Sequence, residues 1–358
     1  MYTFYAQKVL FGTGLSTAEM HAVLQTPDRD ILPLLHAAYQ VRHHYFGRKV
    51  HIHVLMNAKS GLCPEDCAYC SQSAVSNASI DKYPLRPARE MIDAAREAKE
   101  NGAYRYCIVT SGRAPTDNEV DAITDVVRQI KREVDIDICC CLGLLTGEKV
   151  QRLKNAGVDR VNHNLNTSKA HTPHIVSTHT YEDRLKTLYN IQKAGLDTCS
   201  GGIIGMGETH DDIIDMAVSL RDLSVNSIPV NFLHPIAGTP LSNRDSLTPQ
   251  DCLRALCLFR FVNPSTEIRV AGGREKNLRS LQPLSLYPAN SLFMEGYLTT
   301  GGLDVEDTHQ MIADLGFEVE TIRESAVSGQ RSAHPTTTPP ERHDTALLPL
   351  EIESGADS

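Results

Sequence analysis

Residues 106–142 read YCIVTSGRAPTDNEVDAITDVVRQIKREVDIDICCCL and contain the repeating unit of the fold. A short apolar and β-branched run, Tyr106–Thr110, is followed by a polar turn. The next run, Asn118–Glu133, has the spacing of an amphipathic helix, and a second apolar run, Ile136–Leu142, comes after it. This order of strand, helix and strand predicts a parallel β-sheet with helical crossovers.

The same alternation extends over residues 50–300. The other expected strands are Val50–Met56, Arg160–Leu165, Thr198–Ile204, Ile228–Phe232, Ile268–Ala271 and Ala289–Phe293. The other expected helices are Pro87–Asn101, Thr146–Ala156, Tyr181–Ala194, Asp211–Leu223 and Pro249–Val262. Six to eight such units over roughly 250 residues fit an α/β fold of the (β/α)8 TIM-barrel type. A doubly wound open sheet is the alternative, but chemically distinctive residues on many successive strands favour the barrel.

The two ends of the chain differ from this pattern. Residues 1–48 contain one expected helix, Ile31–Tyr45, and are interpreted as an N-terminal helical extension. The barrel is assigned to residues 49–325. Residues 326–358 are rich in Pro, Thr, Ser and charge without a sustained apolar period, so we expect a disordered C-terminal tail.

The composition of the 358-residue chain argues against several classes of protein. A net charge of −9 argues against a nucleic-acid-binding surface. No apolar run approaches the ~20 residues of a membrane span, and the N-terminus does not read as a secretory signal. Ten cysteines in a chain of this length predict a cytoplasmic protein with reduced thiols rather than a disulfide framework.

The sequence Cys63-Pro-Glu-Asp-Cys67-Ala-Tyr-Cys70 brings three thiols together in one short segment. Three thiolates can hold three irons of a [4Fe–4S] cluster and leave the fourth iron open to a small molecule. The alternative is a zinc site, which usually has four ligands, often from paired C-x2-C motifs. Only Cys67 and Cys70 form such a pair here, so the spacing favours the iron–sulfur cluster.

A second group of thiols lies on expected strands. Cys107, Cys139 and Cys199 are each on a different strand, and side chains from different strands meet in layers inside a barrel. They fit a second metal centre, or they are packing residues, because cysteine also packs as a small hydrophobe. Arg269 lies in the apolar run Ile-Arg-Val-Ala, where it requires an anionic partner or a metal centre.

Amide side chains also lie near strand ends. The residues concerned are Asn162, Asn164, Asn166 and Asn231. Buried amides are costly unless hydrogen-bonded, and at a barrel mouth they typically bind polar groups of a ligand; loop capping is the alternative. Residues 201–208, GGIIGMGE, follow a strand, and their glycines allow the backbone to approach a ligand closely.

These motifs resemble those of a known family. Cys63–Cys70 resembles the cluster motif of the radical S-adenosylmethionine superfamily, and residues 201–208 fit its G-x-I-x-G-x-x-E strand motif. Within that superfamily, CPEDCAYCSQS, VNHNLNTS, TCSGGIIGMGET and IRVAGGRE, in this order, resemble the biotin synthase family. The resemblance covers about residues 30 to 320.

The resemblance implies a (β/α)8-barrel homodimer that inserts sulfur into dethiobiotin to give biotin, the last step of biotin biosynthesis. S-adenosylmethionine would bind the open iron and yield a 5′-deoxyadenosyl radical, and a [2Fe–2S] cluster would donate the sulfur. The implied ligands are Cys63, Cys67 and Cys70 for the [4Fe–4S] cluster, and Cys107, Cys139, Cys199 and Arg269 for the [2Fe–2S] cluster. An electron donor such as flavodoxin or ferredoxin is the implied partner.

The resemblance also assigns the binding residues. Those implied for S-adenosylmethionine are Tyr69, Asn164, Asn166, Gly205 and Glu208, and those for dethiobiotin are Arg105, Asn162, Asn164 and Asn231. Within Cys139–Cys141 the choice of ligand stays open, although the distance to Leu142-Gly143 favours Cys139. A related radical methylase or lyase with the first cluster alone, an electron carrier, and a non-catalytic protein with a structural zinc are the alternatives.

Overall fold

The structure is a computed structural model that describes residues 1–322. The expected tail at 326–358, and the last three residues of the expected barrel, lie outside the described residues. Among the described helices, none combines the length and hydrophobicity that crossing a bilayer requires.

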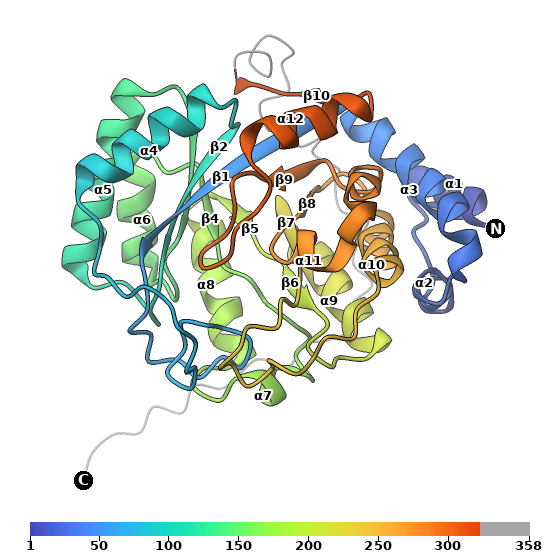
Figure 1. The fold of residues 1–358 in the computed structure, drawn as a ribbon, viewed down its shortest axis with the longest axis horizontal. Helices are drawn as coiled ribbons and strands as arrows, with labels where there is room; N and C mark the ends of the chain where they lie inside the picture. The colour runs from blue at the N-terminus through green and yellow to red at the C-terminus, as the bar shows by residue number, and fades with distance from the viewer. Residues whose placement is uncertain (323–358) are drawn as a thin grey trace. The chain divides into compact units, whose positions relative to one another are not determined.

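The centre of the fold is one closed parallel sheet (Figure 1). Its strands are β1 (Lys49–Lys59), β2 (Arg105–Thr110), β3 (Asp137–Cys141), β4 (Arg160–Asn162), β5 (Asp197–Cys199), β6 (Gly202–Ile204), β7 (Ser227–Phe232), β8 (Glu267–Val270) and β9 (Ser291–Phe293). The first strand pairs with β2 on one side and β9 on the other, so the sheet closes. With β5 and β6 counted as one broken strand, eight strands form the ring, which confirms the predicted TIM-type barrel and excludes the open sheet.

The break between β5 and β6 has a steric cause. A Cβ on Gly201 would lie 1.9 Å from the Pro229 carbonyl oxygen, so only glycine permits this approach of the two backbones. The chain bends there: β5 meets β7 only at Cys199 opposite Ser227, and β6 resumes the pairing with Gly202 opposite Val230. The sequence predicts one continuous strand over this region.

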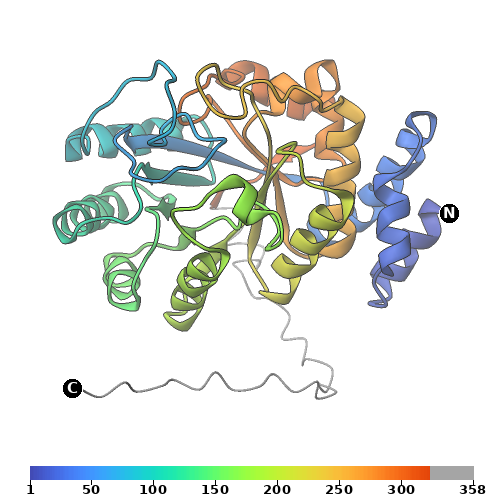
Figure 2. The same cartoon turned by 90° about the horizontal axis from the view of Figure 1, so that it is seen from below.

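Helices cover the outside of the barrel (Figure 2). They are α4 (Ala88–Glu100), α5 (Asp117–Glu133), α6 (Gly147–Ala156), α7 (Thr172–Ile175), α8 (Tyr181–Lys193), α9 (His210–Asp222), α10 (Pro249–Val262), α11 (Arg274–Leu278), the 3₁₀ segment Arg279–Leu286 and α12 (Val305–Asp314). In α5, for example, Thr116 and Glu119 form a capping box, and Val120, Ile123 and Val127 face the barrel with helical spacing. After α12, the short strand β10 (Glu318–Val319) pairs with the start of β1.

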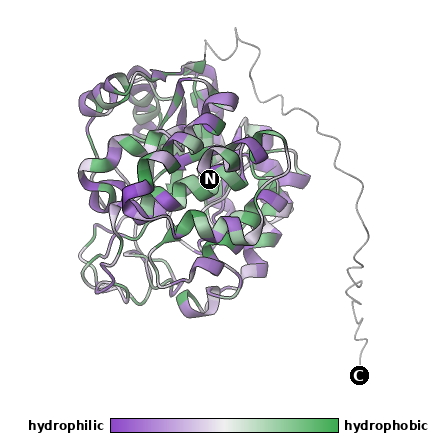
Figure 3. Ribbon diagram, turned by 90° about the vertical axis from the view of Figure 1, so that its right-hand side faces the viewer, coloured by the Kyte–Doolittle hydropathy of each residue, from purple (hydrophilic) through white to green (hydrophobic). Residues whose placement is uncertain are grey.

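The N-terminal region contains more helix than the sequence predicts. Beside α3 (Ile31–Phe46), where one helix is expected, lie α1 (Tyr2–Leu10), α2 (Thr17–Leu24) and a 3₁₀ turn, Asp28–Asp30. These helices pack on the outer side of α10, and Figure 3 faces them. Covered by the barrel on one side and by these helices on the other, α10 buries every residue from Cys252 to Val262. This explains Cys252 and Cys257 as packing residues.

Candidate active site

A cavity of about 410 Å³ opens where the carboxyl ends of the strands meet. The loop thiols Cys63, Cys67 and Cys70 line it, as do the strand thiols Cys107 and Cys139. Thus all three loop thiols and two of the three strand thiols line one cavity, while the third strand thiol, Cys199, is fully buried. In a TIM barrel this face is where enzymes place their chemistry.

The loop carrying the first three thiols is held by its own acidic residue. Glu65 is buried and accepts hydrogen bonds from Arg113 Nη1 (2.9 Å), Thr178 Oγ1 (2.7 Å) and the His179 ring. Burial alone would raise the pKa of Glu65, but these hydrogen bonds lower it, so the carboxylate stays ionised. The loop is therefore tied to residues 178–179 before α8.

The buried environment of the loop thiols Cys67 and Cys70 favours binding of a positively charged metal centre. Burial raises the pKa of Cys67 to about 12 and also raises that of Cys70. A buried thiol that resists ionisation alone becomes a thiolate when a metal takes its proton's place. Together with Cys63, these two thiols give the loop three sulfur ligands, the number that a cluster with one open iron takes from the protein.

The second group of thiols is assembled by sheet register. Cys107 on β2 lies opposite Cys139 on β3, and both side chains line the cavity. The thiol of Cys199 on β5 is fully buried, 3.2 Å from Asn162 Nδ2 and 3.8 Å from Arg269 Nη1. Four strands therefore bring three thiols and one guanidinium to the same end of the cavity.

Alternation along β3 separates the three consecutive cysteines. Cys140 points away from the barrel interior and packs in the hydrophobic core. Cys139 and Cys141 both line the cavity. Cys139 is the one that lies opposite Cys107, whereas Cys141 lies opposite Val109, one pleat nearer the carboxyl end of the strand.

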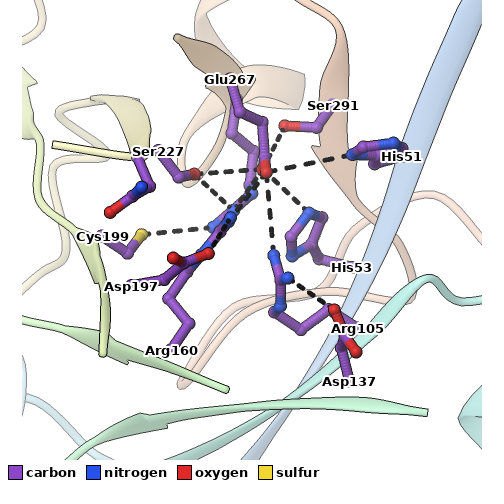
Figure 4. A network of polar contacts seen from close by, with 12 residues as sticks. His51, His53, Arg105, Asp137, Arg160, Asp197, Cys199, Ser227, Glu267 and Ser291 are labelled. Atoms are coloured by element: carbon purple, nitrogen blue, oxygen red, sulfur yellow. Dashed lines mark hydrogen bonds and ion pairs between the residues drawn. The ribbon is translucent and has the colours of Figure 1, made fainter. Parts of the chain in front are cut away.

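Arg269 has the anionic partner that the sequence leads us to expect. Its Nη2 donates to Glu267 Oε1 (2.6 Å) and to Ser227 Oγ (2.9 Å). Figure 4 shows the polar side chains that converge on Glu267 in the barrel interior. Sequence reasoning missed Glu267, although its position two residues before Arg269 places both side chains on one face of β8.

The amide side chains predicted from the sequence all line the cavity; they are Asn162, Asn164, Asn166 and Asn231. Asn162 Nδ2 donates to Asn164 Oδ1 (3.0 Å), and Asn231 bridges two strand ends through the Gly202 carbonyl and the Gly272 amide. Asn166 is hydrogen-bonded to the Tyr69 hydroxyl at 2.5 Å. These contacts fix the amides and leave hydrogen-bonding capacity toward the cavity.

Three predicted binding residues lie away from the cavity wall. Gly205 and Glu208 are absent from the described residues that line it, and the Glu208 carboxylate accepts a hydrogen bond from the Gly205 amide (2.6 Å). Arg105 lies deeper in the barrel, where it pairs with Asp137 at 2.8 Å.

One lining residue that the sequence did not reveal is the cation Arg184. It is nearly buried, donates to the Asn164 carbonyl (2.7 Å) and to His179 Nε2 (3.0 Å), and its charge lowers the pKa of Cys67 against the larger effect of burial. Arg184 is the fourth residue of α8, where an arginine normally faces solvent, so local sequence carries no signal for it.

Two family models match the chain. Residues 59–220 match the radical SAM superfamily, and residues 229–318 match the biotin and thiamin synthesis associated domain. Among curated proteins, a biotin synthase of Bacillus licheniformis is 51% identical over 326 residues, which cover 91% of this chain and 98% of that protein. A biotin synthase of Rhodopirellula baltica is 52% identical over 318 residues, 89% of each chain.

Solved structures share the fold at low identity. Methylornithine synthase superposes with a TM-score of 0.80 at 18% identity, covering 90% of this chain and 99% of that chain. The FeFe-hydrogenase maturase HydG of Carboxydothermus hydrogenoformans gives a TM-score of 0.75 at 19% identity, covering 89% and 79%. At such identity the likeness supports the barrel architecture alone.

Proposed function

The chain belongs to the biotin synthase family, and from this premise we propose that it inserts sulfur into dethiobiotin to give biotin, with S-adenosylmethionine as the radical source. One observation supports this most directly: thiols from two separate groups, Cys63, Cys67 and Cys70 of the loop and Cys107 and Cys139 of the strands, line a single cavity together with fixed amides. A radical methylase or lyase with one cluster has no need of the second group.

For the first group, we propose that Cys63, Cys67 and Cys70 hold a [4Fe–4S] cluster. When bound, the two clusters supply an electron to the sulfonium of S-adenosylmethionine and a sulfide to the substrate. Arg184 is the buried cation beside Cys67, so it suits the carboxylate of S-adenosylmethionine. Asn166 and Tyr69, hydrogen-bonded to each other on the same wall, suit its polar groups.

For the second group, we propose that Cys107, Cys139, Cys199 and Arg269 hold the [2Fe–2S] cluster. Asn162 and Asn231 suit the ureido ring of dethiobiotin, because an amide both donates and accepts, as the two N–H groups and the carbonyl of a urea require. The chain's part in the reaction is to orient the substrate between the two thiol groups and to exclude water.

The other predicted binding residues are proposed in supporting roles. Glu208 fixes the turn at Gly205 next to β6, and Arg105 supports the polar contacts below Cys107 instead of touching the substrate. From the family resemblance we also propose a homodimer, a flavodoxin or ferredoxin as electron donor, and a cytoplasmic location.

The testing experiment is an anaerobic assay of reconstituted protein with dethiobiotin, S-adenosylmethionine and a reductant, read by mass spectrometry. We expect biotin and 5′-deoxyadenosine. 5′-Deoxyadenosine without biotin would keep the superfamily but reject the proposed substrate or the second cluster. Neither product, from protein shown by iron and sulfide analysis to hold both clusters, would overturn the proposal. Zinc in place of iron would favour a structural metal site.

A further inference from the structure

A single carboxylate inside the barrel, that of Glu267, is surrounded by hydrogen-bond donors (Figure 4). Oε1 accepts from Arg269 Nη2 (2.6 Å), Ser227 Oγ (3.1 Å) and Ser291 Oγ (3.0 Å), and Oε2 accepts from Arg160 Nη1 (2.8 Å). The Glu267 side chain is only 7% exposed. Arginine contacts lower the pKa of this carboxyl well below its usual range even though burial opposes them.

The arginines around Glu267 depend on it to different degrees. Arg160 has a second carboxylate in Asp197 (3.4 Å), and Arg105, whose Nη1 lies 3.7 Å from Glu267, has one in Asp137 (2.8 Å). Among the described residues, the only carboxylate paired with Arg269 is Glu267. A buried guanidinium without an anionic partner is strongly unfavourable. Of these three arginines, Arg269 is therefore the one whose buried charge depends on Glu267 alone.

The hydrogen bonds of Arg269 also fix which edge of its guanidinium faces the thiols. Nη2 is taken by Glu267 and Ser227, whereas Nη1 faces Cys199 Sγ at 3.8 Å. The buried Nε has no hydrogen-bond partner among the described residues. A long side chain with many rotamers is therefore held with Nη1 and Nε available to whatever the strand thiols bind.

From this geometry we propose that Glu267, together with Ser227, is a positioning residue for the second cluster. It holds the Arg269 guanidinium so that its free edge meets the cluster between the strand thiols. The inference rests on the proposed function, because it requires that a [2Fe–2S] cluster binds there. Residues that hold a metal ligand from behind typically change metal affinity by roughly 10–100-fold when removed.

Two serines offer a matched test. Ser227 and Ser291 are both fully buried, and each donates to the same oxygen of Glu267. Ser227 also accepts from Arg269, whereas Ser291 has no hydrogen bond to Arg269 among the described residues; the Ile268 carbonyl (3.4 Å) is only an alternative acceptor for its single proton. In holoenzyme reconstituted with both clusters, the readout is the rate at which a chelator bleaches the [2Fe–2S] absorption, with the melting temperature of each variant measured alongside.

We expect Ser227→Ala to accelerate [2Fe–2S] loss about tenfold and Ser291→Ala to change it less than twofold, at similar melting temperatures. Glu267→Gln should accelerate loss more, and adding it to Arg269→Ala should have no further effect, because it acts through that arginine. Equal rates for the two serine variants, or additive effects in the double variant, would overturn the positioning role while leaving the proposed function intact. A wild-type protein that takes up only the [4Fe–4S] cluster would overturn both.

Discussion

The carboxylate of Glu65 is predicted to set the stability of the loop that carries the first three thiols. Glu65→Ala removes the acceptor shared by Arg113, Thr178 and His179. The exposed fractions of these three side chains differ, and they determine how much stability the substitution costs. The Arg113 side chain is 42% exposed and Thr178 is exposed, so both regain water, whereas the His179 side chain is 6% exposed and its Nδ1 is left without a partner.

A hydrogen bond to a charged group is worth about 1.5–3 kcal/mol, and an orphaned buried donor costs a similar amount. With the exposed partners discounted, we expect Glu65→Ala to lower the free energy of unfolding by about 2–3 kcal/mol. Glu65→Gln keeps the shape and one acceptor oxygen and should lose about half as much. We expect this loss of stability to come from weaker anchoring of residues 63–74.

The assay is denaturant unfolding of the apoprotein, with amide hydrogen exchange followed over residues 63–74 and 177–180. The variant should show lower protection in both segments and retain less iron per chain after reconstitution. Wild-type protection in the loop, together with an unfolding free energy within ~0.5 kcal/mol of wild type, would show that Glu65 does not anchor it.

Three further outcomes are expected. Cys199→Ala should retain reductive cleavage of S-adenosylmethionine and abolish biotin formation, whereas the packing variant Cys257→Ala should keep both; biotin from the first would refute the two-cluster assignment. Hydrogen bonds lower the pKa of Asp66 below its ordinary 3.8, although burial opposes them. The stability that the Asp66 carboxylate contributes is therefore present above pH ~4 and is lost on further acidification, which amide hydrogen exchange of the loop measured at decreasing pH checks. Gly201→Ala should cost more than ~3 kcal/mol, because the new Cβ meets a backbone oxygen at 1.9 Å, whereas Gly301→Ala meets nothing within 4 Å and should be neutral by thermal unfolding.

The sequence predicts the barrel well because its signal is local and repeated. Most strands are short apolar runs, and helices such as α5, α8, α9 and α10 have their own buried apolar face and a capping box, so the order of elements specifies the architecture. The break after Cys199 could not be foreseen, since it depends on the approach of Gly201 to Pro229, far away in the chain. The extra N-terminal helices are short and weakly patterned, and they are stabilised by tertiary packing, α1 mainly on α3 and α2 on α10 and α9.

Some residues of the candidate site could likewise be predicted from the sequence, and others could not. The thiols of Cys63–Cys70 are recognisable because their spacing is itself the signal, and the amides stand out because polar residues near buried strands are unusual. The local sequence does not distinguish Glu267 and Arg184, because acidic and basic residues near the ends of strands and helices are common in any protein. What distinguishes them is the set of partners that other strands and loops bring to them.

The pairing of the first barrel strand with the last ones has a consequence for synthesis of the chain. His51 in β1 lies opposite Ser291, Lys49 lies opposite Glu318, and the His51 ring reaches the Glu320 carboxylate at 2.7 Å. The ribosome must therefore release the chain past Phe293 before the ring can close, and past Glu320 before β10 can cover the start of β1. Until then, β1 keeps an unpaired edge, and such an edge invites association with other chains. Until the ring closes, the barrel also does not yet enclose the strand thiols Cys107, Cys139 and Cys199, which are buried in the finished fold.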